Sequence, residues 1–220
     1  GTAVFPRLPD RPQAACELDI VLPDGAPYAA WRVATGLRAL ATDARGAGRY
    51  AATDYDELVD CPIEIGDWQH IGYTACGVAH EIVVAGRCTI DLDRLARDLE
   101  RVCSAQIRLY GEPAPFERYL FLVMAVGDGY GGLEHRNSTS LLCARDDLPQ
   151  PGTTEVTDGY RTFLGLCSHE YFHAWNVKRI RPAAFAPYDY ARENYTRLLW
   201  AFEGITSYYD DLMLMRAGLI

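Results

Sequence analysis

The segment Ser168–Asn176 reads SHEYFHAWN and contains two histidines four residues apart, with a glutamate directly after the first. On a helix, His169 and His173 would lie one turn apart on the same face, where both imidazoles can reach one tetrahedral Zn²⁺. Glu170 would lie at the neighbouring edge, where a carboxylate can act as general base on a zinc-bound water. The alternative is two ordinary helix histidines in a chance register. Because the chain has only five histidines, we predict a zinc site.

The residues around the motif predict the helix that such a site needs. Phe163, Leu166 and Phe172 recur at helical spacing and form an apolar stripe beside the histidine pair. We expect the helix to begin at Thr157 or Asp158 and to run through the motif.

A catalytic zinc usually has three protein ligands and one open position, so the motif needs a third ligand. The candidate is Glu203, the one charged residue in the apolar stretch 198–205, where an unpaired carboxylate would be costly. The alternative for Glu203 is an ion pair with Arg192 or Arg197. Three other histidines are weaker candidate ligands: His70, His80 and His135. Three polar residues after Glu203 could hydrogen-bond a ligand histidine: Thr206, Ser207 and Asp210.

Length and charge limit the kinds of function. The 220 residues suffice for one large domain or two small ones, and 49% hydrophobic with 23% charged residues is typical of soluble globular proteins. The net charge is −9, and the only basic cluster is VKRIRP at 177–182, which argues against a nucleic-acid partner. The longest apolar run, Tyr119–Val126, is far too short to span a bilayer.

Seven cysteines without a CxxC pair fit neither a Cys-rich zinc module nor a dense disulfide scaffold. We expect most of them to be buried thiols, and the pattern still allows one or two disulfides, so the compartment is left unknown. No signal-peptide pattern follows Gly1, and the chain stops at Ile220 directly after a helical pattern. We therefore expect the sequence to be a fragment of a longer protein.

The spacing of hydrophobic residues changes near residue 90. Three segments before it read as strands: 16–23, 29–37 and 80–86. The acidic segment 53–68 reads as loop and strand. After the change, 91–103 has the spacing of an amphipathic helix, with Asp91 as its cap. We predict an α+β fold with a β-rich domain at 1–90 and a second domain at 91–220.

Within the second domain, strands are expected at 118–126 and 138–145, separated by the glycine-dense segment 127–137. Residues 193–218 have helical spacing, and Gly218 is a suitable stop for that helix.

Four segments together resemble the glycyl aminopeptidase family of zinc metallopeptidases, in the gluzincin group. They are HEYFHAWNVKRIRP (169–182), WAFEGITSYY (200–209), DYDELVDCPIEIG (54–66) and GYGGLEHRNSTSL (129–141). The resemblance implies a thermolysin-like catalytic domain preceded by a β-sheet domain. It also implies that His169, His173 and Glu203 bind Zn²⁺ and that Glu170 is the base. Longer members of the family carry a helical portion and a PDZ domain afterwards, so we expect a PDZ domain downstream in the full-length protein.

The segment GGLEH (131–135) is similar to the Gly-x-Met-Glu-Asn segment of related aminopeptidases, with His135 where asparagine usually stands. That looser analogy implies that Glu134 binds the free α-amino group of a peptide and that the flexible glycines, Gly132 among them, let the backbone pair with the substrate. The alternative is a tight turn with a solvated glutamate. A phosphate-binding loop is excluded, because no Gly-Lys-Ser/Thr follows.

The function that these inferences predict is a zinc aminopeptidase that removes N-terminal residues from peptides; small residues such as Gly or Ala are implied by the resemblance alone. A thermolysin-type endopeptidase and a non-catalytic, zinc-containing peptide-binding module are the alternatives. The oxyanion-stabilising donor is left open among Tyr208, Tyr209, His135 and residues beyond this chain. Residue preference, oligomeric state and the activity of this fragment are also left open.

Overall fold

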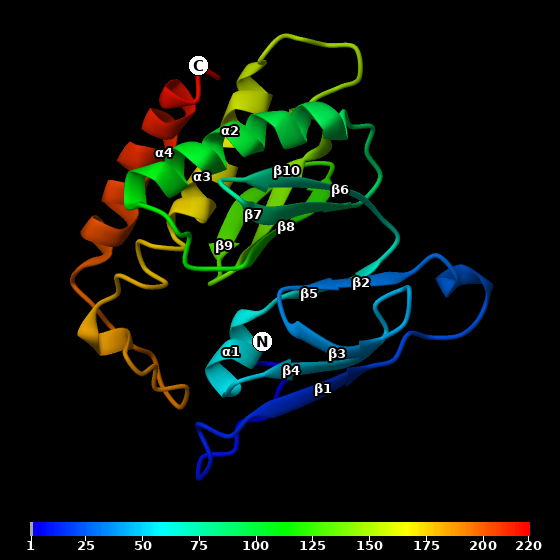
Figure 1. The fold of residues 1–220 in the computed structure, drawn as a ribbon, viewed down its shortest axis with the longest axis vertical. Coiled ribbons are helices and arrows are strands. Elements are labelled where there is room, and N and C mark those ends of the chain that lie inside the picture. Colours follow the sequence, from blue (N-terminus) through cyan, green and yellow to red (C-terminus); the bar gives the residue numbers. More distant parts are fainter. Residues whose placement is uncertain (1) are drawn as a thin grey trace. The chain divides into compact units, whose positions relative to one another are not determined.

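The computed structural model describes residues 2–220, which divide into two compact units (Figure 1). The first unit ends at Gln69 and the second begins at His70. This division does not coincide with the change expected near residue 90, because the strands between 70 and 85 join the sheet of the second unit. Residue 90 instead lies just before helix α2 (Leu92–Tyr110).

The first unit consists mainly of short strands around a small apolar core. Its elements are β1 (Cys16–Ile20), β2 (Arg32–Thr35), β3 (Arg38–Thr42), β4 (Gly48–Ala52), α1 (Tyr55–Asp60) and β5 (Ile63–Gly66), with a 3-10 turn at Ala26–Tyr28. Antiparallel pairing joins β1, β4 and β3 in one sheet and β2 and β5 in another. The prediction of a sheet-rich N-terminal portion in an α+β protein is confirmed.

Helix α1 lies in the segment that we expect as loop and strand. Asp54 caps the helix by accepting a hydrogen bond from the Glu57 amide at 2.8 Å, and the Glu57 carboxylate accepts from the Thr53 amide in return. This reciprocal pairing satisfies amide groups that have no partner inside the helix. The interpretation as loop is wrong over residues 55–60, where the acidic composition outweighs the capping signal of Asp54 and Glu57.

The second unit is built on a mixed five-stranded sheet in the order β6-β7-β8-β10-β9. Its strands are β6 (Trp68–Ala75), β7 (Val78–Ala85), β8 (Arg118–Val126), β9 (Tyr130–Glu134) and β10 (Ser138–Ala144). Strands β7, β8 and β10 run parallel, and β9 pairs antiparallel with β10 at one edge. Buried aliphatic and aromatic side chains of β7, β8 and β10 belong to the hydrophobic core of this unit, as is typical of parallel strands.

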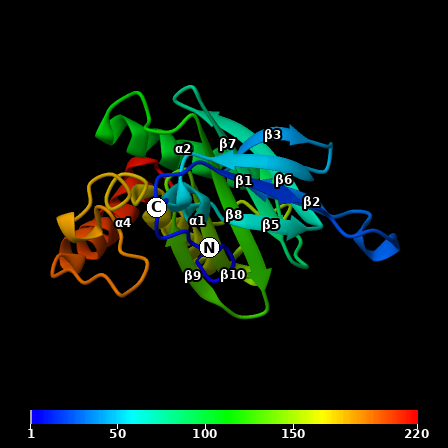
Figure 2. The ribbon, with the colours of Figure 1, turned by 90° about the horizontal axis from the view of Figure 1, so that it is seen from below.

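Helices α2, α3 (Asp158–Phe172) and α4 (Ile205–Arg216) lie together on one face of this sheet, as Figures 1 and 2 show. The two predicted helix starts are confirmed by their caps. Asp91 accepts from the Arg94 amide at 2.9 Å, and Thr157 accepts from the Tyr160 amide at 3.2 Å. A single π-helical turn, Trp200–Gly204, leads into α4.

Strand β9 lies within the glycine-dense segment 127–137, which we expect only as a connector. Gly131 and Gly132 contribute no side chains, so the alternation of apolar and polar residues that marks a strand is absent there. The strand is defined instead by its ladder with β10, in which Gly132 faces Leu141.

Two other expectations can be compared with the structure. Cys103, Cys143 and Cys167 are buried thiols in the core of the second unit, as expected for most of the cysteines. Among residues 2–220, no helix combines the length and apolar character needed to cross a membrane.

Candidate metal centre

The two histidines of the motif meet at the C-terminal end of α3. Their Nε2 atoms lie 3.1 Å apart, and the rings are nearly perpendicular. His169 is on the last turn of the helix, and His173 is the C-cap residue. The i and i+4 spacing therefore brings two imidazole nitrogens to one point.

Glu203 completes the group from a distant part of the chain. Its Oε2 atom lies 3.4 Å from Nε2 of His169 and 3.6 Å from Nε2 of His173. The three donor atoms lie within 4.8 Å of one another, so the group could hold a metal ion. Two imidazoles and a carboxylate are a donor set that suits zinc, and the residues present therefore fit the metal that the resemblance implies.

Hydrogen bonds fix the orientation of both imidazoles. Nδ1 of His169 lies 2.9 Å from the Asp210 carboxylate, and Nδ1 of His173 lies 2.8 Å from the main-chain oxygen of Asn176. Both partners accept, so each Nδ1 carries a proton and each Nε2 is left with its lone pair toward the metal position. Burial by itself would lower the pKa of His169, but the hydrogen bond to Asp210 and nearby carboxylates raise it.

The Glu203 turn is held against the end of α3 by Asn176. Its Nδ2 donates to Oγ1 of Thr206 at 3.1 Å and to the Ala201 oxygen at 3.3 Å. Asn176 and Thr206 are both buried. Sequence reasoning included Thr206 only as a candidate contact of a ligand histidine and missed Asn176; a polar residue among buried apolar neighbours was the available signal.

Glu170 is buried beside the metal group and packs against β9. A Cβ atom built on Gly132 would overlap the Glu170 carboxylate and would lie only 2.6 Å from its Cγ. Glycine at this position therefore leaves the space that the Glu170 side chain occupies. The Oε2 atom of Glu170 is buried and has no hydrogen-bond partner among residues 2–220. Burial, followed by the nearby Glu134 charge, raises the pKa of Glu170 to about 8.

Glu134 ends β9 and lies close enough to Glu170 for the two charges to interact. Strand β9 pairs with β10 on one side only and forms the edge of the sheet. The two residues predicted to bind substrate, Gly132 and Glu134, are thus both on the edge strand that Glu170 contacts.

The other candidate ligands lie outside the three-residue donor group. His80 is in the core, where its Nε2 lies 2.9 Å from the Tyr171 hydroxyl, and His70 lies 3.7 Å from the Glu81 carboxylate. His135 is buried after β9 and does not belong to the three-residue donor group. Glu203 makes its ion-pair contacts with His169 and His173, whereas Arg192 pairs with Asp189.

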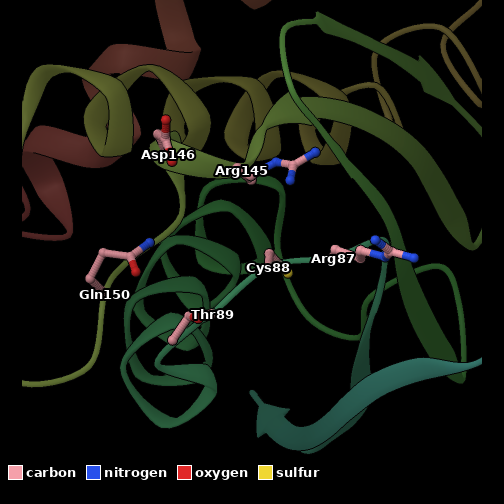
Figure 3. Close-up of a pocket in the computed structure, with 6 residues that line it drawn as sticks. All are labelled: Arg87, Cys88, Thr89, Arg145, Asp146 and Gln150. Carbon is pink, nitrogen blue, oxygen red and sulfur yellow. The ribbon is translucent and has the colours of Figure 1, made fainter.

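A cavity of about 470 Å³ opens elsewhere in the second unit. It is lined by Arg87, Cys88, Thr89, Arg145, Asp146 and Gln150 (Figure 3). None of the three metal donors lines it, so it is separate from the metal centre.

Comparison with known families agrees with this geometry. Residues 162–220, which contain all three donors and Glu170, match the family model described as M61 glycyl aminopeptidase. Residues 1–67 match the model of the peptidase M61 N-terminal domain. The two matches together span more than half of the chain. The chain belongs to the M61 glycyl aminopeptidase family.

One solved structure similar to this M61 chain is the crystal structure of an aminopeptidase N family protein from Idiomarina loihiensis. The two are 46% identical, with a TM-score of 0.92 over 96% of this chain. The alignment covers 36% of that protein, so the chain spans about a third of its length. No curated protein matches the chain.

Proposed function

We propose that this chain contains the catalytic centre of a zinc-dependent aminopeptidase. The convergence of His169, His173 and Glu203, with Glu170 beside them, carries the proposal. Membership in a peptidase family and the likeness to an aminopeptidase family structure support it. The thermolysin-like character of the second unit, the preference for Gly or Ala and a downstream PDZ domain are parts of the same proposal that rest on the resemblance.

Glu170 is the proposed general base and acid. Zinc, when bound, supplies a coordinated water of lowered pKa and a positive charge for the peptide carbonyl. Glu170 accepts the proton of the attacking water and returns it to the leaving amine. In the metal-free site, burial and the Glu134 charge raise the pKa of Glu170 to about 8. A zinc ion held beside it would lower that pKa and favour the carboxylate form, which can accept a proton. The buried Oε2 of Glu170, which has no partner among the described residues, is available for this transfer.

The pair Glu134 and Glu170 favours an aminopeptidase over an endopeptidase. Two nearby carboxylates repel each other, as the raised pKa of Glu170 reflects. A protonated α-amino group bound at Glu134 would reduce this repulsion, whereas a blocked amino terminus would not. The open edge of β9 offers backbone groups to which an extended peptide can add as a further strand.

One experiment tests both assignments. Glu170→Gln keeps the shape of the side chain but removes the base, so zinc binding should persist while turnover falls about a hundredfold to ten-thousandfold. Metal content and hydrolysis of glycyl and alanyl peptides are measured, each with a free and a blocked amino terminus. In the same assay, Glu134→Gln should remove the preference for the free terminus.

Full activity of Glu170→Gln would refute the mechanism. Equal cleavage of free and blocked peptides by the wild type would identify an endopeptidase. Zinc binding without hydrolysis of any peptide would favour a non-catalytic module.

A further inference from the structure

Gln106 is an unusual residue for the face of α2 that packs on the core. It is fully buried in a helix whose other inward residues are mostly apolar, such as Leu99, Val102 and Ile107. Its Oε1 atom is buried and has no hydrogen-bond partner among residues 2–220. A buried carbonyl without a partner costs free energy, so packing alone does not explain an amide at this position.

The other end of the amide begins a directed chain of hydrogen bonds. Nε2 of Gln106 lies 2.9 Å from both the main-chain oxygen and Oγ of Ser168, and Oγ of Ser168 lies 2.9 Å from the main-chain oxygen of Asp210. A main-chain oxygen only accepts, so the Ser168 hydroxyl must donate to Asp210. The hydroxyl can then only accept from Gln106, which fixes the orientation of the amide.

The chain ends at the metal group. The side chain of Asp210, whose main chain receives the Ser168 hydroxyl, accepts from Nδ1 of His169 at 2.9 Å. Gln106 on α2, Ser168 on α3 and Asp210 on α4 therefore join three helices at one point. Ser168 directly precedes His169 in the chain, and its hydroxyl is bonded to the main chain of Asp210. The hydrogen bonds of Ser168 therefore position both the donor, His169, and the acceptor, Asp210, of the next bond.

We propose that Gln106 is a positioning residue for the metal centre. It acts through Ser168, which holds the main chain of Asp210 so that the Asp210 carboxylate stays on His169. This inference rests on the proposed function, because it takes the group of His169, His173 and Glu203 as a zinc site. Partners that orient a ligand histidine typically change metal affinity 10- to 100-fold when they are removed.

The test replaces Gln106 with methionine, which keeps the length and nearly the volume of the side chain but cannot donate. We expect Gln106→Met to weaken zinc binding about tenfold in a chelator competition assay. The stability of the zinc-free protein should be kept or increased, because the substitution also removes the unpaired Oε1. A purely structural role predicts the reverse, with lower stability and unchanged zinc affinity.

Tyr160→Phe is the matched control. The Tyr160 hydroxyl donates to the Asp98 carboxylate at 2.8 Å and so also links α3 to α2. Asp98 lies on α2, eight residues before Gln106. This control removes a partly buried hydrogen bond between the same helices but should leave zinc affinity unchanged. Ser168→Ala should weaken zinc binding at least as much as Gln106→Met. If the two residues act in series, the double variant should bind zinc no more weakly than Ser168→Ala does.

A readout without metal separates this inference from the proposed function. The Nδ1 proton of His169, hydrogen-bonded to Asp210, should give a side-chain NMR signal that shifts or broadens in Gln106→Met and not in Tyr160→Phe. Unchanged signal and unchanged zinc affinity in Gln106→Met would overturn the positioning role while leaving the zinc site intact. If the wild type binds no zinc but the signal responds, the chain of hydrogen bonds stands and the proposed function falls.

Discussion

Two buried histidines of the second unit, His80 and His173, differ in what their second ring nitrogen faces. Each places Nδ1 against a main-chain oxygen, at 2.9 Å from Val78 and 2.8 Å from Asn176 respectively. Nε2 of His80 then lies 2.9 Å from the Tyr171 hydroxyl, a donor that satisfies it within the core. Nε2 of His173 instead faces a nitrogen of another imidazole and an oxygen of a carboxylate. Neither atom can donate a hydrogen bond to Nε2 unless it is protonated, so a proton or a bound cation is needed between these acceptors.

The difference shows that burial alone does not mark a ligand. His80 is 1% exposed and His173 is 2% exposed. What separates them is the donor that tertiary packing brings to Nε2. Tyr171 lies midway between His169 and His173 along α3, so it points away from both of them and into the aromatic cluster around His80. Helix α3 thus supplies a hydrogen-bond donor to a core histidine on one face and carries candidate metal ligands on the other.

Of the predicted effects, the loss of zinc affinity on removing a metal ligand should be the largest. His173→Ala takes away one of three proposed donors, so zinc affinity should fall on the order of a thousandfold. His80→Ala should leave zinc affinity unchanged, because His80 contacts none of the donors. Isothermal titration with zinc measures both. A comparable loss in the two variants would mean that the distinction between them is wrong.

The next effect concerns stability and pH. Burial lowers the pKa of His80 to about 4, whereas an unfolded chain has its histidines near 6.5. The unfolded state therefore binds more protons between these values, and stability should fall as pH drops from about 6.5 to about 4, by about 3 kcal/mol in total.

Urea unfolding of the zinc-free protein at several pH values measures that slope. His80→Leu should be less stable at pH 7, because the Tyr171 hydroxyl loses its acceptor, and its stability should depend less on pH. An unchanged slope in His80→Leu would show that another group is responsible.

A smaller effect is expected where the metal face of α3 meets β9. Gly132→Ala places a methyl group where the Glu170 carboxylate lies, so the base should be displaced and kcat should fall about a hundredfold. Gly131→Ala is the matched control in the same strand, because a Cβ there meets no atom within 4 Å. Peptide hydrolysis and zinc content are measured for both. Equal losses in the two variants would assign the effect to the strand rather than to Glu170.

Elements with local signals are predictable from the sequence. The starts of α2 and α3 follow from Asp91 and Thr157, whose side chains cap helices through contacts three residues away. Strand β9 and helix α1 are not predicted, for two different reasons. Residues 131 and 132 lack the side chains that would show alternation, whereas the caps of α1 are present in the sequence but were outweighed by its acidic, loop-like composition.

The metal centre, too, is predictable from the sequence only where the signal is local. The spacing of His169 and His173 alone determines that their side chains share a helix face, because the periodicity of a helix is local. In the sequence, the partner Glu203 is visible only as a charge in an apolar stretch, and its zinc role stays a prediction. Only the tertiary structure decides that Glu203 meets both histidines, that Gly132 leaves room for Glu170, and that Gln106 and Ser168 hold Asp210. These contacts join segments far apart in the chain, and packing of the helices and β9 creates them.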